Sequence, residues 1–420
     1  MSANTDVINE LRSPSMKATT GVQLSIMMFF EYFVWGAWYV TMGTYMSEHL
    51  HSSGVQIGAA YSALAIATMI SPFFVGMIAD RYFYAQKLNG VLHLIGAALL
   101  YLAINVSDNA IFYWIILVYS LLYMPTIGLT NNVAFTQMHD PGKQFPAIRV
   151  FGTLGWIAAG FVIGQTGWEK TPNTFILAAV VSAIYGLYSF TLPSTPPKAK
   201  TAERTSFAKS IGAEAMVLFK DKSYLIFFIA AILICIPLAF YYGFANLFLV
   251  EKGMEDAAGK MILGQISEAI FILAIPFLFN RIGVKNMLIM GMTAWALRYF
   301  AFGNGDTGAN LWLLYAGIIL HGICYDFFFV TGYMYTEKKA GEKIKNSAQG
   351  LFTFATYGVG MFIGTWFSGF VVDKYKIEGG HDWLKVWSVP AYIAIGVLFL
   401  FILFFRDRKN KPGNIVADAT

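Results

Sequence analysis

The sequence is poor in charge and almost free of cysteine. Of its 420 residues, 13% are charged, two are cysteines and 57% are hydrophobic. An ordinary soluble domain carries about 25% charged residues, so the composition excludes that class and indicates a helical membrane protein. Both cysteines, Cys235 and Cys324, lie inside apolar runs. There we expect them to pack as small side chains and not to form a disulfide or bind a metal.

Several motifs of nucleotide and metal chemistry are also missing. The sequence contains no phosphate-binding loop, no HExxH pair and no Cys–His spacing of a metal site. We therefore expect neither ATP-driven transport nor metalloprotease activity. The net charge of +5 does not predict a nucleic-acid partner, because in a membrane protein the positions of Lys and Arg matter more than their sum.

Twelve apolar runs each predict a membrane-spanning helix, and their continuity excludes an outer-membrane barrel, whose strands alternate. The runs lie near 24–47, 55–79, 88–105, 110–137, 147–165, 173–192, 223–249, 261–280, 286–303, 310–336, 346–372 and 383–405. A polar connection separates them into two groups of six. The predicted parts are an N-terminal tail (1–22), a first half (23–192), a central loop (193–222), a second half (223–405) and a C-terminal tail (406–420). The polar tail leads directly into a full-length run, so we expect the first helix to be its own insertion signal.

The distribution of Lys and Arg predicts the orientation. If the N-terminus is cytoplasmic, the cytoplasmic segments hold 21 of these residues and the opposite loops hold six. Positive residues concentrate on the cytoplasmic side, so both termini are predicted to be cytoplasmic. Two groups of six helices joined by a long basic loop are typical of a secondary transporter, whose substrate site lies between the repeats near the middle of the bilayer.

Two carboxylates inside the apolar runs are candidate functional groups. Asp326 is the single charged residue of the tenth run, and Glu31 lies inside the first. A charge at mid-membrane costs about 2.5–3.5 kcal/mol, so it must face protein or water. Glu31, Trp35 and Trp38 share one helix face, which predicts a cavity wall able to stack a planar ring. The alternative for Glu31 is a structural carboxylate bonded to hydroxyl groups of a neighbouring helix.

The eighth run carries Gln265 and Glu268 on one face, at i and i+3. Gln can donate or accept hydrogen bonds and ionised Glu can accept them, so a ribose diol suits the pair. The alternative is contact between helices, which polar residues often provide in membranes.

Arg149 lies at the inner end of the fifth run, with Thr153 and Trp156 on the same face. It is either a site residue, which would need a carboxylate such as Asp326 or Glu268, or an arginine that extends to the lipid headgroups.

Arg298 and His321 have simpler predicted roles. Arg298, near the outer end of the ninth run, is predicted to be structural and to extend to the headgroups. His321, one turn before Tyr325, is either part of a proton relay or a hydrogen-bonded packing residue.

Two short motifs resemble the loop signature of the major facilitator superfamily. They are Gly76–Arg81 (GMIADR) and Phe279–Lys285 (FNRIGVK). Further motifs, spread over almost the whole chain, are similar to the nucleoside:proton symporter family, the NupG-like permeases. They are Trp35–Trp38 (WGAW), Gly43–Tyr45 (GTY), Tyr123–Leu129 (YMPTIGL), Ile148–Gly155 (IRVFGTLG), Gln265–Glu268 (QISE), Ala294–Arg298 (AWALR) and Tyr325–Phe328 (YDFF).

The resemblance implies an all-α membrane protein with twelve transmembrane helices in two six-helix halves, the major facilitator fold, in a bacterial inner membrane. It implies proton-coupled nucleoside uptake by alternating access. Such a protein is a secondary active transporter and not an enzyme, and the proton gradient drives it without a cofactor. In the seventh helix the chain departs from the family pattern, because Ala239 and Tyr242 stand where the enteric permeases carry amides.

The residues and the resemblance together predict binding, coupling and gating groups. The predicted binding residues are Trp35, Trp38, Arg149, Thr153, Trp156, Asn246, Gln265, Glu268 and Tyr325. The predicted proton-coupling residues are Asp326 as first choice, Glu268 as second, and Glu31. Asp80 and Arg81 form either a gate latch or a solvated loop pair.

The expected partners are a nucleoside, protons and the lipid bilayer, with no nucleic acid, and we expect a monomer. Two other functions stay open on the residues alone. One is symport of another polar solute such as a sugar. The other is a non-transporting membrane receptor or sensor, which would usually carry a larger soluble domain than the central loop provides.

Overall fold

Helices account for almost all of the chain in the computed structural model, which describes residues 16–75, 82–197, 208 and 211–406. The helices of the first half are α2 (Ala18–Trp38), α3 (Met42–Glu48), α4 (Gly54–Phe74), α6 (Ala85–Ala103), α7 (Asn109–Gln137), α8 (Pro141–Thr166), η2 (Trp168–Lys170) and α9 (Asn173–Ser189). The elements that follow are η3 (Ala213–Lys220), α11 (Lys222–Glu251), α12 (Ala257–Asn304), α13 (Leu311–Tyr325), η4 (Asp326–Val330), α14 (Thr331–Thr353), η5 (Phe354–Gly360), α15 (Met361–Lys374), β1 (Lys376–Ile377), β2 (Gly380–His381) and α16 (Trp383–Phe404).

Several helix starts are fixed by an aspartate that accepts hydrogen bonds from backbone N–H groups of the first turn. These are Asp108 before α7, Asp140 before α8, Asp221 before α11 and Asp382 before α16. Such a cap satisfies N–H groups that have no partner within the helix. The short polar segments between apolar runs therefore set where the spanning helices begin.

Two of the long helices contain a chain reversal at a glycine. Within α12, Gly283 has φ 77° and ψ 163°, and within α14, Gly341 has φ 65° and ψ −179°. Only glycine adopts such angles readily. Both glycines lie in predicted connections, at 281–285 and 337–345. The first separates the eighth span from the ninth, and the second separates the tenth from the eleventh, so the twelve-helix prediction is confirmed.

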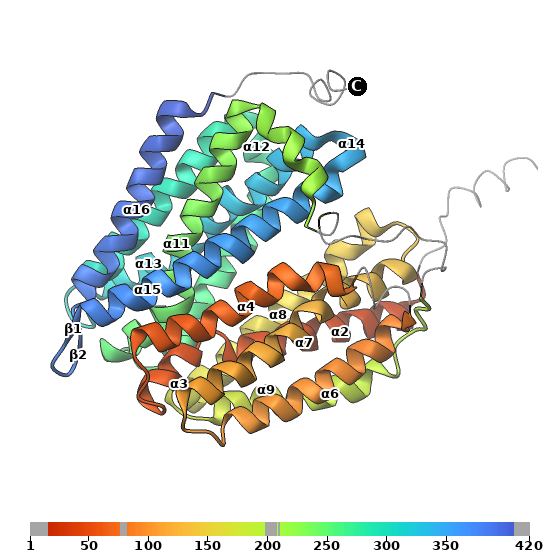
Figure 1. Ribbon diagram of the computed structural model, residues 1–420, viewed down its shortest axis with the longest axis horizontal. Helices are drawn as coiled ribbons and strands as arrows, with labels where there is room; N and C mark the ends of the chain where they lie inside the picture. The colour runs from red at the N-terminus through yellow and green to blue at the C-terminus, as the bar shows by residue number, and fades with distance from the viewer. Residues whose placement is uncertain (1–15, 76–81, 198–207, 209–210, 407–420) are drawn as a thin grey trace, which may run out of the picture.

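The spans form two bundles (Figure 1). In the first half, α2 packs against α8 and α9, and α6 packs against α7 and α9. In the second half, α12 packs against α13 and α16, and α11 packs against α15 and α16. Between the halves, α4 lies along α15, α8 along the first part of α12, and α3 beside α11. The two halves meet near α3 and the β1–β2 hairpin and diverge toward the other end (Figure 1).

The halves approach each other so closely at that end because glycines line both contacts. A Cβ atom on Gly58 of α4 would overlap the carbonyl oxygen of Thr365 in α15. A Cβ atom on Gly164 of α8 would overlap the backbone of Gly259 in α12. Small residues allow this close approach of membrane helices. We call this side of the molecule the closed end.

Two carboxylates reinforce the closed end by capping helices of the opposite half. Asp373, near the end of α15, accepts hydrogen bonds from the backbone N–H groups of Gly54 (2.5 Å) and Val55 (2.8 Å) at the start of α4. Glu169 in η2 accepts a hydrogen bond from the backbone N–H of Ala258 at the start of α12. Each half therefore holds the N-terminus of a spanning helix in the other half, where a negative charge is favoured.

Candidate functional site

A central cavity of about 760 Å³ lies between the two halves. This volume is within the range of small-molecule sites. Its walls come from the parts of the helices that lie away from the closed end, including Val75 near the end of α4 and Thr353 at the end of α14. Because the halves are in contact at the closed end, the cavity lies on the side of the first and last described residues, Met16 and Arg406.

Seven of the predicted binding residues line this cavity. They are Trp35 of α2, Arg149, Thr153 and Trp156 of α8, Gln265 and Glu268 of α12, and Tyr325 of α13. They come from both halves and meet only in the folded protein. Their roles in binding remain predictions.

Aromatic side chains make one wall of the cavity. The rings of Trp35 and Trp156 lie edge to face, with centroids 5.6 Å apart. The ring centroid of Tyr39 lies 5.4 Å from that of Tyr242, which comes from the opposite half. Both tyrosines line the cavity, as does Tyr61. The sequence analysis missed Tyr39 and Tyr61, because the many tyrosines of this chain carry no signal that separates lining residues from packing residues.

Arg149 lies in the cavity and does not extend to the headgroups. Its guanidinium group stacks on the ring of Tyr32, 4.0 Å from the centroid. Its positive charge also acts on the Glu268 carboxylate. Arg149 from the first half and Glu268 from the second thus provide opposite charges to one cavity.

Glu268 belongs to a chain of polar groups that leads away from the cavity. Its Oε2 atom is 3.7 Å from Nε2 of His321, which also lines the cavity. The other ring nitrogen, Nδ1, is 2.9 Å from Nη1 of Arg298. Arg298 is fully buried, with its guanidinium group 3.5 Å from the centroid of the Tyr241 ring. The prediction that Arg298 extends to the headgroups is therefore wrong, because its partners lie on α11 and α13 inside the second half.

Asp326 lies behind the cavity wall and not in the cavity. It is fully buried, and neither carboxylate oxygen has a hydrogen-bond partner among the described residues. It begins η4, a π-helical turn, and such turns are frequent at functional sites. The preceding residue, Tyr325, does line the cavity, and its hydroxyl is 2.5 Å from that of Tyr357. In this conformation Glu268, and not Asp326, is the carboxylate that faces Arg149.

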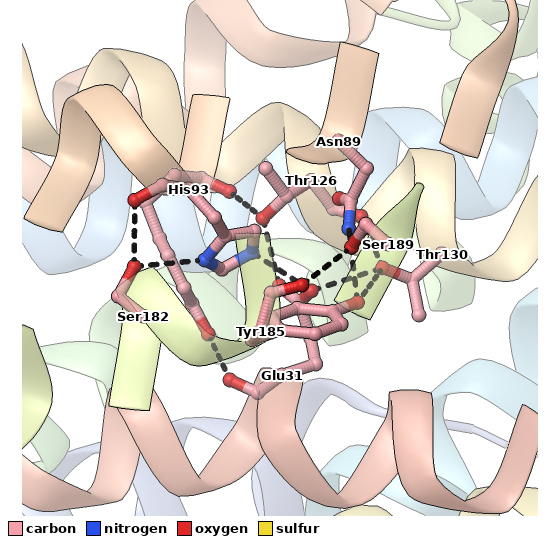
Figure 2. A network of polar contacts seen from close by, with 9 residues as sticks. Glu31, Asn89, His93, Thr126, Thr130, Ser182, Tyr185 and Ser189 are labelled. Carbon is pink, nitrogen blue, oxygen red and sulfur yellow. Dashed lines mark hydrogen bonds and ion pairs between the residues drawn. The ribbon is translucent and has the colours of Figure 1, made fainter. Parts of the chain in front are cut away.

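Glu31 points into the interior of the first half (Figure 2). Its carboxylate accepts hydrogen bonds from Thr126 (2.7 Å) and Thr130 (2.9 Å) of α7 and lies 3.2 Å from Nε2 of His93 in α6. His93 Nδ1 in turn lies 3.1 Å from the hydroxyl of Ser182 in α9. The prediction that Glu31 belongs to the cavity wall is wrong, and the structural alternative describes its surroundings. His93 was missed, although a histidine inside an apolar run is itself a signal.

Two further predicted binding residues lie outside the cavity. Trp38 is fully buried and packs against Tyr119 and Phe175, with ring centroids 5.4 and 6.0 Å away. Asn246 of α11 accepts a hydrogen bond of 2.6 Å from Thr44 of α3, so it joins the halves at the closed end. The predicted gating pair, Asp80 and Arg81, lies outside the described residues.

Two bundles of six helices that enclose a central cavity with polar and aromatic walls, open on one side and closed on the other, define a secondary transporter of the major facilitator fold. Comparison with known proteins identifies the family. The family model "Nucleoside H+ symporter" matches residues 16–410. The chain belongs to this family, so it is a proton-coupled nucleoside transporter and not an enzyme.

Individual relatives agree with this assignment. The chain is 40% identical to the putative nucleoside transporter YegT of Escherichia coli, over 95% of this chain and 97% of the relative. It is 36% identical to the xanthosine permease of the same organism, over 92% of this chain and 96% of the relative. The crystal structure of the nucleoside transporter NupG matches with a TM-score of 0.86 and 35% identity, over 93% of this chain and all of the other. The resemblance seen in the sequence is thereby confirmed.

Proposed function

We propose that the protein imports nucleosides together with protons across a bacterial inner membrane, with both termini in the cytoplasm. The cavity carries this proposal, because it places an aromatic wall beside a polar group suited to ribose. With the termini in the cytoplasm, the cavity faces inward and the closed end faces outward. Residues of one chain line the cavity, and the proposed unit of transport is the monomer. It needs no cofactor beyond the proton gradient.

Substrate binding divides between the two halves. Trp35 and Trp156 contact the base, because their rings offer apolar faces in the cavity. Gln265 and Glu268 lie one turn apart on α12 and bind the ribose hydroxyls. Since the base contacts lie in the first half and the ribose contacts in the second, a bound nucleoside draws the halves together around itself.

Proton coupling uses Asp326 and Glu268. A carboxylate ion that is buried without a hydrogen bond is unfavourable by several kcal/mol, so Asp326 holds a proton in this conformation. In the proposed cycle Asp326 takes up this proton while the cavity faces outward and carries it into the inward-facing state. A movement of η4 that exposes Asp326 to the inward-facing cavity then releases the proton to the cytoplasm. Glu268 shares the cavity with Arg149, and its carboxyl group hydrogen-bonds the ribose when substrate enters.

Alternating access requires the closed end to separate. The caps made by Asp373 and Glu169 and the Thr44–Asn246 hydrogen bond must break together for the outward side to open. Each links one half to the other, so they favour the inward-facing state in the absence of substrate.

Uptake of radiolabelled uridine and adenosine into proteoliposomes tests the proposal. Accumulation above equilibration with an inward proton gradient, lost on addition of a protonophore, supports it. A Glu268→Gln variant should then show strongly reduced uptake. If folded protein takes up neither nucleoside but accumulates a sugar, the proposed substrate is wrong.

A further inference from the structure

We propose that Arg298 is a positioning residue that keeps His321 neutral, with its ring proton on Nε2. His321 is then a permanent hydrogen-bond donor that faces Glu268 in the cavity and takes no part in carrying the proton. This inference rests on the proposed function, in which Glu268 binds a substrate hydroxyl. Arg298 itself is fully buried and does not line the cavity.

The position of the ring proton follows from the donors available. An arginine has five N–H donors and no acceptor. Because Nη1 of Arg298 is 2.9 Å from Nδ1 of His321, Nδ1 must accept this hydrogen bond and cannot carry a proton. The proton of the neutral ring is therefore on Nε2. A second proton on Nδ1 would face an N–H group of a cation at the same distance, with both side chains at most 1% exposed.

A purely structural role does not account for Arg298. Its Nε and Nη2 atoms are buried and have no hydrogen-bond partner among the described residues. Buried donors without partners are unfavourable and call for a specific explanation. The guanidinium carbon of Arg298 lies 3.5 Å from the centroid of the Tyr241 ring. The same ring stacks on His321, with ring centroids 5.0 Å apart. Tyr241 thus aligns the cation with the histidine.

Four side chains surround His321 among the described residues, and Glu268 is the acidic one on the cavity side. Arg298 and Tyr241 contact it from α12 and α11, and Tyr325 lies one turn away on α13, with ring centroids 5.6 Å apart. The first part of α12 contributes Glu268, whose Oε2 atom is 3.7 Å from Nε2. That distance is too long for a hydrogen bond. A substrate hydroxyl placed between the two atoms accepts from Nε2–H and donates to the carboxylate, so the pair selects a hydroxyl group.

Histidine NMR tests the ring proton without any need for transport. In protein labelled with ¹⁵N-histidine, the His321 signals are assigned by their loss in H321Q. We expect the neutral ring with the proton on Nε2 throughout the range between about pH 5 and 8, where histidine ordinarily changes charge. A His321 ring that becomes doubly protonated in this range, or carries its proton on Nδ1, overturns the proposal. That result leaves the proposed nucleoside transport untouched.

Equilibrium binding of uridine tests the part played by Arg298. In R298Q an amide replaces the cation, so His321 can gain a second proton and pair with Glu268 in place of the hydroxyl. We expect uridine binding by R298Q to weaken about tenfold one pH unit below the new titration midpoint. The double variant R298Q/H321Q should lose this pH-dependent decrease in uridine affinity. The dependence of uridine affinity on pH should have the same shape in the wild type and in H321Q. The proposal is contradicted if the uridine affinity of the wild type falls at low pH and H321Q removes that fall. It is also contradicted if the affinity of R298Q depends on pH in the same way as that of the wild type. If R298Q is unfolded, the NMR result decides alone.

Discussion

Removal of the Asp373 carboxylate is predicted to open the closed end. In Asp373→Ala, the backbone N–H groups of Gly54 and Val55 lose acceptors at 2.5 and 2.8 Å. Hydrogen bonds to a charged group are worth about 1.5–3 kcal/mol each, but these are partly exposed, and water replaces part of the loss. We therefore expect a net loss of about 2 kcal/mol, which favours separation of the halves at this end by about 30-fold.

Distances between spin labels measure this shift. His49 and Glu378 are exposed on opposite halves at the closed end, so labels can be attached there, and the labelled wild type controls for loss of the His49–Tyr45 ring contact. In Asp373→Ala the distance distribution should gain a longer component that is weak or absent in the wild type. The native cysteines, Cys235 and Cys324, are buried and should react little with the label.

Asp382 provides a matched control. It lies at the same end and accepts a hydrogen bond from the backbone N–H of Lys385, but both residues belong to the second half. Asp382→Ala removes a helix cap without removing a contact between halves, so the label distance should not change. An unchanged distance distribution in Asp373→Ala, or an equal change in both variants, would refute the claim that the Asp373 cap holds the two halves together.

Three further predictions concern the cavity and the central connection. Glu268→Gln should raise the KM for uridine by about 10- to 100-fold, because a charged acceptor is lost, with little change in the midpoint of thermal unfolding. Asp326→Asn should abolish accumulation under a proton gradient but retain exchange of labelled for unlabelled uridine, and accumulation by this variant would exclude Asp326 as the carrier. Burial opposes the charge of Asp221, yet the Lys339 ammonium group 2.6 Å away lowers the pKa of this carboxyl overall. The pair should therefore stabilise the protein above about pH 4, and Asp221→Asn should lower the unfolding temperature at pH 7 but not at strongly acidic pH.

Features that depend on the order of residues along the chain could be predicted from the sequence. The apolar runs located the twelve spans, and the connections at 281–285 and 337–345 contain the glycines at which the chain reverses. The family motifs led to Arg149, Gln265 and Glu268, all of which line the cavity. Length, hydropathy and motif are local properties, and none of them requires knowledge of neighbouring helices.

The direction of a side chain within a fully packed helix could not be predicted in the same way. A surface helix has one apolar face, but α2 packs against α7, α8 and α9 and so has partners on several sides. Trp35 turns toward the cavity, whereas Glu31 turns toward α6 and α7 and Trp38 toward α7 and α9. Their spacing of i, i+4 and i+7 predicted one common face. In the fold, the three side chains have different surroundings: the cavity for Trp35 and different neighbouring helices for Glu31 and Trp38.

The hydrogen-bond and stacking partners of buried polar residues could not be predicted for a related reason. Arg298 lies near a helix end, where an arginine commonly reaches the headgroups, and only the packing of α11 and α13 against α12 provides Tyr241 and His321 as alternatives. Asn246 looked like a cavity residue because it is polar and lies inside an apolar helix. Its partner Thr44, far away in the sequence, shows that it belongs to the closed end.

Proton entry driven by a nucleoside gradient tests the central claim most directly. Proteoliposomes that contain a pH-sensitive dye receive external uridine with no proton gradient imposed. The account predicts that the lumen acidifies as uridine enters, and that Asp326→Asn removes this acidification. Uridine entry without acidification, or acidification caused by a sugar and not by uridine, would contradict proton-coupled nucleoside transport through this cavity.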